Sequence, residues 1–491
     1  MENRKSGVLL HISSLPGTRG IGSFGQAAYD FVDWLVSAKQ TYWQILPLCQ
    51  TSFGDSPYAS FSTFAGNPYF IDLKMLEEEG LLTREDYDYT DYEDTYDQIN
   101  YGKLYELRYP ILRKAVSKFK ETKEFEAFKS DNSFWLNNYC LYMALKDYFK
   151  GCDWLNWPKE YRNKDKKVLD KFKEENKETI RFWEVVQYLF TKQWTKLKKY
   201  ANDNGIKIIG DCPIYVALDS ADVYFDRELF QLEKDGTPKA IAGCPPDAFS
   251  ADGQLWGNPL YDYKYHEKTG FKWWKQRVSY LCKQYDLLRI DHFRGIEAYW
   301  SIPYGEETGK NGKWVKGPNM KLINAFKEVT KDDQIIAEDL GTLTEETYKM
   351  IEESGYPGMR VLEFAFDGDN KNVHLPHNMP RNCVAYIGTH DNEPIMAWKK
   401  NNNGYVLNNA YSYLNCPQNE TFNWSMINEL EKSQAKICII QAQDILGLEE
   451  WSRTNTPNTT GINFKWRLRG DSLNNDNANL LKVITTIYGR D

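Results

Sequence analysis

The residues of this chain best suited to chemistry stand within or just after short apolar runs. In LLRIDHFRG, residues 287–295, two leucines and an isoleucine accompany Arg289, Asp291 and His292. Such groups are costly to bury unless they pair or react. The full set at the ends of such runs is His11, Asp211, Arg289, Asp291, His292, Glu338, Asp339, His390 and Asp391. Convergent carboxylates without a metal-ligand pattern are typical of glycosyl chemistry, in which one attacks the anomeric carbon and a second moves the proton, while a third can stabilise the transition state.

The spacing within this set predicts different tasks for the carboxylates. Arg289 stands two residues before Asp291, so the two side chains share one strand face, and pairing would keep Asp291 ionised. Glu338 follows the apolar run QIIA, which predicts the raised pKa of a general acid. A retaining double displacement needs these two carboxyl groups about 5 to 6 Å apart.

Each polar residue at a strand end also has a structural interpretation. A single acid in this position is most simply the N-cap of a following helix, and we expect Asp339 and Asn392 to be structural groups of this kind. His292 points away from Asp291 along a strand. It either orients a neighbouring group or contacts the substrate, and the sequence leaves both readings open.

Eight apolar runs alternate with helical patterns along the chain. They cover residues 7–12, 41–48, 206–214, 286–293, 334–340, 359–366, 383–391 and 435–446. After the first run, QAAYDFVDWLVSA places its apolar residues at helical spacing. Strands that alternate with helices pair in parallel, so the fold class is α/β, a (β/α)8 TIM barrel whose catalytic residues lie at the C-terminal ends of the strands.

The intervals between the runs are uneven. We expect residues 1–491 to form a single catalytic barrel domain with large insertions after the second and third strands. Residues 51–205 are rich in helix formers and aromatics, and predict an inserted helical subdomain. Residues 215–285 predict an inserted active-site loop region, because insertions on one face of a barrel shape the site there.

The composition excludes several classes of partner. A net charge of −8 argues against nucleic acid and anionic membranes, which need a concentrated basic surface. No apolar stretch approaches the roughly 18 residues of a membrane span, and the N-terminus does not resemble a signal peptide. Nine scattered cysteines without a CxxC pattern predict free thiols in the cytoplasm. Aromatics at 15% favour a carbohydrate-binding surface over a large core alone.

Four other functions fit part of the pattern. Gly20, Gly22 and Gly25 form GxGxxG, but seven residues separate it from the first strand, which argues against a dinucleotide-dependent oxidoreductase. A metal-dependent barrel hydrolase would need clustered histidines, and His11 has no HxH partner. A non-catalytic sugar-binding protein would not need three catalytic groups on successive strands. An α-glucan hydrolase of the same barrel type stays the nearest alternative.

A family resemblance rests on motifs spread over nearly the whole chain. RIDHFRG, AEDLG and GTHDN resemble the catalytic blocks of the 4-α-glucanotransferases (amylomaltases, or disproportionating enzymes). LLHISSLPG, GIGSFG, GDSPYASFSTFAGNPY, GDCPIYV, CPPDAFSADGQLWGNPLYD and HLPHN are also similar to family segments.

The resemblance implies a role for each matching residue. It makes Asp291 the nucleophile of a β-glucosyl-enzyme, Glu338 the general acid/base and Asp391 the stabiliser of the transition state. Tyr58, Asp211, Arg289 and His390 would bind the donor sugar, whereas Gln254, Trp256 and Asn258 lie in the loop that would close over the acceptor side. The implied substrates are malto-oligosaccharide donors with glucose or maltodextrin acceptors, no cofactor and no metal are expected, and we expect a monomer or a homodimer.

Two positions depart from the family pattern. After GTHDN the family continues with an acid, Thr, two residues and Gly-Trp, whereas this chain reads EPIMAW from Glu393 to Trp398. Ala248 stands where some relatives carry Tyr, which predicts a different grip on long glucans.

Overall fold

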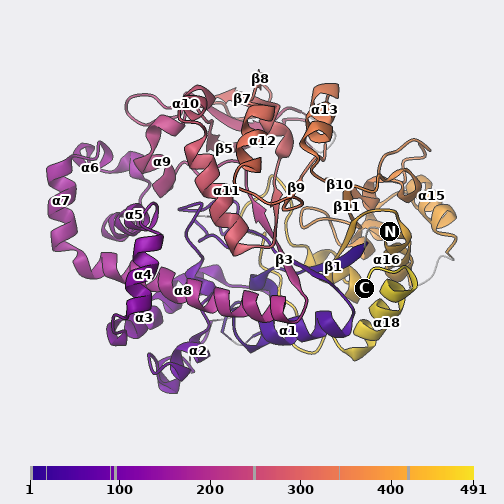
Figure 1. The fold of residues 1–491 in the computed structure, drawn as a ribbon, viewed down its shortest axis with the longest axis horizontal. Coiled ribbons are helices and arrows are strands. Elements are labelled where there is room, and N and C mark those ends of the chain that lie inside the picture. Colours follow the sequence, from indigo (N-terminus) through magenta and orange to yellow (C-terminus); the bar gives the residue numbers. More distant parts are fainter. Residues whose placement is uncertain are drawn as a thin grey trace.

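Eight parallel strands form the centre of the molecule in a computed structural model that describes residues 4–17, 19–52, 54–88, 90–92, 97–246, 250–341, 343–416 and 421–491. Their order is β10-β11-β12-β1-β2-β3-β6-β9. The Ala337 amide donates to the Pro357 carbonyl at 2.9 Å and joins β9 to the start of β10. The predicted (β/α)8 barrel is therefore confirmed (Figure 1).

Each of the eight predicted apolar runs overlaps a barrel strand. The strands are β1 (Lys5–Leu9), β2 (Tyr42–Gln44), β3 (Lys207–Cys212), β6 (Leu287–Ile290), β9 (Ile335–Ala337), β10 (Gly358–Val361), β11 (Cys383–Tyr386) and β12 (Ile437–Gln441). One face of the strands contributes a compact cluster that includes Leu9, Ile209, Ile336, Val361, Val384 and Ile439. The other face packs on helices through a larger cluster with Val8, Ile208 and Leu288. Strands buried on both faces read as continuous apolar runs, and this is why the sequence predicts them.

Helices cover the outside of the barrel. They include α1 (Gln26–Ser37), α8 (Lys177–Asp203), α11 (Lys272–Gln284), α12 (Met320–Lys327), α13 (Glu345–Ser354), α16 (Phe422–Lys432) and α18 (Asn475–Ile487). The helix predicted after the first strand is α1, which buries Ala28, Phe31, Trp34 and Leu35 on one face. In α13, Thr344 accepts a hydrogen bond from Thr347 N at the N-terminus, and Gly355 adopts φ 73° at the other end.

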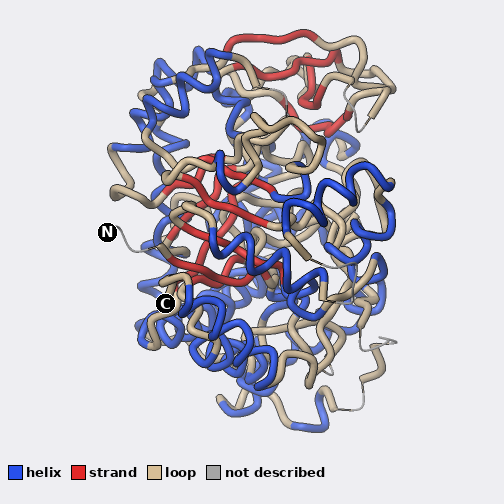
Figure 2. Tube along the Cα trace, turned by 90° about the vertical axis from the view of Figure 1, so that its right-hand side faces the viewer, coloured by secondary structure: helices blue, strands red, loops and turns tan. Residues whose placement is uncertain are grey.

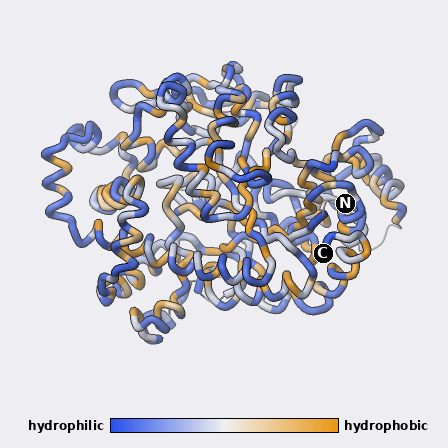
Figure 3. The backbone as a smooth tube through the Cα atoms, viewed as in Figure 1, coloured by the Kyte–Doolittle hydropathy of each residue, from blue (hydrophilic) through white to orange (hydrophobic). Residues whose placement is uncertain are grey.

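The long interval between β2 and β3 is mainly helical. It contains α2 (Leu73–Glu78), α3 (Tyr101–Lys118), α4 (Lys123–Asp131), α5 (Leu136–Tyr148), α6 (Lys159–Arg162) and α7 (Lys166–Glu175), before α8 returns the chain to the barrel. Figure 1 shows these helices beside the barrel, on the side away from both termini. The charged α7 buries Leu169 and Phe172 and is mostly hydrophilic in Figure 3. A helix with a narrow apolar stripe and charges elsewhere packs on one side and faces solvent on the other.

The interval between β3 and β6 is more regular than the predicted loop region. Its strands β4 (Ala240–Cys244) and β5 (Gln254–Pro259) join β7 (Ala298–Pro303) and β8 (Lys313–Lys316) in an antiparallel sheet of order β5-β4-β7-β8. Figure 2 shows this sheet apart from the barrel strands. The prediction of a loop was wrong for these residues. The sheet pairs β4 with β7, which belongs to a later interval of the sequence, and the edge strand β8 is largely exposed, so it is not a buried apolar run of the kind that marks the barrel strands. The remaining helices there are α9 (Ala221–Phe225) and α10 (Tyr263–Lys268).

Three other expectations concern the chain as a whole. All nine cysteines lie in the described ranges and are free thiols, as expected. Among the described residues, no helix combines the length and the apolar character needed to cross a membrane. Ala248 lies outside the described residues, so the prediction about its grip on long glucans stays a prediction.

Candidate active site

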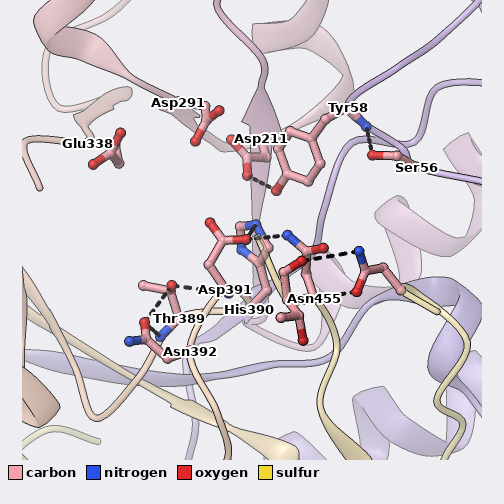
Figure 4. A network of polar contacts seen from close by, with 12 residues as sticks. Ser56, Tyr58, Asp211, Asp291, Glu338, Thr389, His390, Asp391, Asn392 and Asn455 are labelled. Carbon is pink, nitrogen blue, oxygen red and sulfur yellow. Dashed lines mark hydrogen bonds and ion pairs between the residues drawn. The ribbon is translucent and has the colours of Figure 1, made fainter. Parts of the chain in front are cut away.

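The predicted catalytic residues come together at the C-terminal ends of neighbouring strands. Backbone hydrogen bonds hold these residues beside the ends of the adjacent strands: Asp291 N donates to Cys212 O at 3.0 Å, and Glu338 N donates to Ile290 O at 3.1 Å. Figure 4 shows the carboxyl groups of Asp291, Glu338 and Asp391 facing a common space, with Asp211 and Tyr58 beside it. These residues come from segments far apart in sequence, and parallel strands bring their ends to one mouth.

Arg289 pairs with two carboxylates at once. Its Nη1 lies 2.8 and 2.7 Å from the two oxygens of Asp211, and its Nη2 lies 2.9 Å from Asp291 Oδ1. The side chains of Arg289 and Asp211 are 3% and 0% exposed. The predicted pair of Arg289 and Asp291 is present. Asp211, on the adjacent strand, makes the closer contact, because both of its carboxylate oxygens bind the guanidinium group. The β3–β6 register, which sets Asp211 opposite Arg289, explains this.

Burial sets the protonation of the two central carboxyl groups. It raises the pKa of Asp291 to about 6, although the Arg289 charge acts to lower it. The expected pairing with Arg289 is present, but burial has the larger effect on the pKa of Asp291. Burial also raises the pKa of Glu338 to about 8, against the lowering effect of Arg289 and with the charge of Asp291 raising it. The raised pKa expected for Glu338 is confirmed in direction, so near pH 7 Asp291 is mainly ionised and Glu338 mainly protonated.

Two backbone amides fix the orientation of Glu338. Leu340 N donates to Oε1 at 2.8 Å, and His292 N donates to Oε2 at 2.6 Å. His292 can aim its amide this way because its backbone is left-handed, with φ 51°. The residue therefore orients its neighbour through the main chain, which is one of the two readings left open by the sequence.

The His292 ring faces the second insertion. Its centroid lies 4.8 Å from the Trp256 ring at an interplanar angle of 87°. Burial lowers the pKa of His292 to about 3, so the ring is neutral. Within the described residues its Nε2 is buried and has no hydrogen-bond partner. The ring therefore supports Trp256 by packing and leaves one polar atom free for a ligand.

Asp391 is held by a segment that the sequence analysis missed. Asn455 Nδ2 donates to Asp391 Oδ1 at 2.6 Å (Figure 4). Arg453 Nη2 donates to the Asp391 carbonyl at 2.9 Å. His390 Nε2 lies 3.3 Å from the same Oδ1. Asn455 follows no apolar run, so the strand-end rule could not find it. The signal available was a polar stretch, SRTNT, beyond the last barrel strand.

Tyr58 reaches the site from the first insertion. Its hydroxyl donates to Asp211 Oδ2 at 2.7 Å, and its ring stacks on His390 at 5.2 Å with an interplanar angle of 11°. The segment that carries Tyr58 is thus tied to both β3 and the end of β11. This brings Tyr58 beside the predicted donor-site residues, where a sugar ring would meet an aromatic face.

The three residues predicted on the acceptor side lie on β5. Trp256 Nε1 donates to Gln254 Oε1 at 2.9 Å, which fixes the two side chains together. Asn258 Nδ2 donates to Val216 O at 2.8 Å and ties β5 to the segment after β3. Of the three, Trp256 has the direct link toward the catalytic residues, through His292.

Three strand-end residues are structural. Asp339 accepts from Met359 N at 2.5 Å and pairs with Arg360 at 3.0 Å, and Asn392 Oδ1 accepts from both N and Oγ1 of Thr389 at 2.9 Å. His11 Nδ1 accepts from Leu46 N at 3.2 Å, and burial lowers its pKa to about 3. Asp339 and Asn392 therefore have structural contacts, as expected, but neither is a helix N-cap: Thr344 holds that position in α13 and Pro394 in α14.

The departure after GTHDN has a regular structure. Pro394 is the N-cap of α14 (Ile395–Asn401), and Ile395 N donates to Asp444 Oδ1 at 2.8 Å. A proline beside the first helical turn fits because the amide it lacks would have no helical partner. The turn therefore leads directly into a helix, and Asp391 keeps its place at the site.

Comparison with known proteins points to one family. The profile of the family described as 4-alpha-glucanotransferase matches residues 10–474. A 4-alpha-glucanotransferase of Clostridium butyricum is 49% identical, with 98% of this chain and 100% of that protein covered. One from Aquifex aeolicus is 42% identical, covering 99% and 100%. Among solved structures, the amylomaltase of Streptococcus agalactiae, in complex with acarbose, superposes with a TM-score of 0.97 at 42% identity, covering 99% of each chain.

Proposed function

The chain belongs to the 4-α-glucanotransferase family, and we propose that it moves α-1,4-glucan segments from a maltodextrin donor to glucose or another maltodextrin by a retaining double displacement. The observation that supports this mechanism is that two neighbouring carboxyl groups have different partners and different pKa values. Asp291 is paired with Arg289, whereas Glu338 is held by backbone amides with a higher pKa. Such a difference separates a nucleophile from a general acid.

The first step breaks the donor's glycosidic bond. The Asp291 carboxylate attacks the anomeric carbon of the donor, while Glu338 gives its proton to the departing glycosidic oxygen. The products are a β-linked glycosyl ester on Asp291 and a shortened glucan with a free 4-hydroxyl. Asp291 can act as the nucleophile because Arg289 holds one of its oxygens and so orients the other.

The second step restores the enzyme. Glu338, now ionised, removes the proton from the 4-hydroxyl of the acceptor, whose oxygen attacks the ester-bound carbon and releases Asp291. Two inversions retain the α-configuration. Asp391 faces the same space and supplies negative charge near the positively charged transition state, and Asn455 and His390 hold it there.

The remaining residues divide between donor and acceptor. We assign Tyr58, Asp211, Arg289 and His390 to the donor sugar, because they form one connected group around Asp291. We assign Gln254, Trp256 and Asn258 to the acceptor side. A loop that covers the site with Trp256 favours transfer over hydrolysis, because it excludes water while it offers a sugar-binding face.

Maltotriose disproportionation tests the activity. The purified protein should convert maltotriose into glucose and longer maltodextrins, measured by chromatography, with no net increase in reducing ends. Shortening with new reducing ends would instead support the hydrolase alternative.

Trapping the glycosyl-enzyme tests the mechanism. Glu338→Gln should accept a maltosyl unit from α-maltosyl fluoride, whose leaving group needs no acid, and should then release it slowly because the base is missing. Mass spectrometry should find the added unit on the peptide with Asp291. A β-configured transfer product, seen by NMR, would contradict double displacement.

Other expectations remain proposals. We propose a cytoplasmic monomer or homodimer that needs no cofactor or metal, with residues 51–205 as a helical subdomain and 215–285 as an active-site region. Chelators should leave the transfer rate unchanged, and sedimentation should give the oligomeric state.

A further inference from the structure

A cavity of about 370 Å³ lies between the two insertions, outside the catalytic group. Helices α5, α9, α10 and α11 contribute to its wall, and Figure 1 shows α5 beside α9. None of the catalytic or sugar-binding residues assigned above lines it. Its volume falls within the roughly 300–1,000 Å³ of ligand pockets.

Aromatic rings form one part of the wall. Phe64, Phe134 and Trp273 line the cavity, with Phe134 and Trp273 both edge-on to Phe64 at 5.4 and 6.4 Å. Phe134 is 42% exposed, whereas Phe64 and Trp273 are 7% and 8% exposed. The exposed ring of Phe134 thus stands at the rim, over a floor that is already packed. Such a surface covers the C–H face of a sugar ring.

Polar side chains form the rest of the wall. Asn138, Asp226 and Gln276 line the cavity, and none makes a side-chain hydrogen bond to any residue that the structure describes. Asn138 and Gln276 offer both donors and acceptors, as the hydroxyl groups of a sugar require. Asp226, Glu228 and Asp222 disfavour an anionic ligand, and Lys272 disfavours a cationic one. A neutral polyhydroxyl ligand fits this set.

The geometry points to a second binding site, in which the cavity holds a distant stretch of the same α-1,4-glucan chain on which the active site acts. This inference rests on the proposed function, because it takes the glucan substrate from there. The cavity floor includes Ser62 and Phe64, in the segment that carries Tyr58. Asp222 Oδ2 accepts from Thr63 N at 2.9 Å and joins this segment to α9. A long donor held here would raise its effective concentration at the active site, whereas a trisaccharide held in the active site would be too short to use both.

The test separates long from short substrates. In Phe134→Ala/Gln276→Ala, KM for amylose should rise at least threefold, with kcat and all maltotriose parameters unchanged. Phe134 is partly exposed, and the Gln276 side chain makes no hydrogen bond within the described part of the chain, so folding should survive, as circular dichroism checks. The matched control is Tyr348→Ala, an exposed ring on α13 that is 48% exposed, and it should change nothing.

Binding gives an independent measurement. In the inactive Asp291→Asn background, calorimetry with maltoheptaose should find two sites, and one after the double substitution. Gln276→Trp, which fills the cavity, should likewise leave one. A single site before and after substitution, or an unchanged KM for amylose, would overturn the inference. Absence of maltotriose disproportionation by the wild-type protein would instead refute the proposed function.

Discussion

Arg289 and Asp211 form a fully enclosed pair in which one guanidinium nitrogen contacts both carboxylate oxygens, at 2.8 and 2.7 Å. The pair joins β3 to β6 directly below Asp291, to which Arg289 also extends its other nitrogen. The Asp291 carboxylate, which we propose as the nucleophile, is thus oriented by a guanidinium that Asp211 holds in place.

Removing the charge of Asp211 should lower both the stability of the protein and its transfer activity. Asp211→Asn leaves a buried guanidinium with only Asp291 to balance it, and breaking a buried pair costs about 3–5 kcal/mol. We expect urea unfolding to show a loss approaching this range, together with loss of transfer. Asp203→Asn breaks an exposed pair with Lys199 and should change stability by less than about 1 kcal/mol. Equal effects in the two variants would argue against the anchoring role.

Substitution of the two central carboxyl groups should stop transfer without unfolding. Glu338→Gln should lose roughly 10²–10⁴-fold in kcat, the usual contribution of a general acid. Asp291→Asn should lose more, while Arg289 keeps its pair with Asp211 and so preserves the fold. Circular dichroism and the maltotriose assay check both points. Substantial activity in Asp291→Asn would rule it out as the nucleophile.

Transfer should show a bell-shaped dependence on pH. Asp291 must be ionised, so kcat/KM should fall below about pH 6, where its raised pKa lies. Glu338 must be protonated in the first step, so kcat/KM should fall above about pH 8. With α-maltosyl fluoride as donor, glycosylation needs no acid, and the alkaline fall should disappear from the rate of glycosyl-enzyme formation. An alkaline fall that persists there would belong to another group.

Asn455 should be needed to position Asp391. Its Nδ2 donates to Oδ1 at 2.6 Å, and a hydrogen bond to a charged group is worth about 1.5–3 kcal/mol. If the bond supports the transition state, Asn455→Ala should lower kcat/KM roughly 10- to 100-fold. Asn401→Ala removes an exposed amide–carboxylate bond to Glu393, and should leave kcat/KM unchanged.

Two buried acids behind the site should make stability depend on pH. Burial raises the pKa of Asp444 to about 7, and raises that of Glu363 well above its usual range. A carboxyl group with a raised native pKa stabilises the fold at low pH, and this stability is lost as pH rises from about 4 through the native value. The free energy of unfolding should therefore be lower at pH 8 than at pH 5. Asp444→Asn should shrink that difference by up to about 3 kcal/mol, whereas the exposed control Asp203→Asn should leave it unchanged.

The sequence by itself determined the barrel and most of the proposed catalytic set. Strands such as β3 and β6 are buried on both faces, so each is a continuous apolar run. Such a run can be recognised from the sequence without knowing which strand it pairs with. Parallel pairing then brings every strand end to one mouth, and Asp291, Glu338 and Asp391 could be chosen before any coordinates.

Only the tertiary structure decided the partners and the electrostatics. The register of β3 against β6 assigns most of Arg289 to Asp211, and burial raises the pKa of Asp291 despite that cation. Asn455 contacts Asp391 across 64 residues, and β4 pairs with β7 although β5, α10, α11 and β6 lie between them in the sequence. Periodicity reports which residues are buried, whereas register, desolvation and long-range pairing depend on segments that meet only in the folded chain.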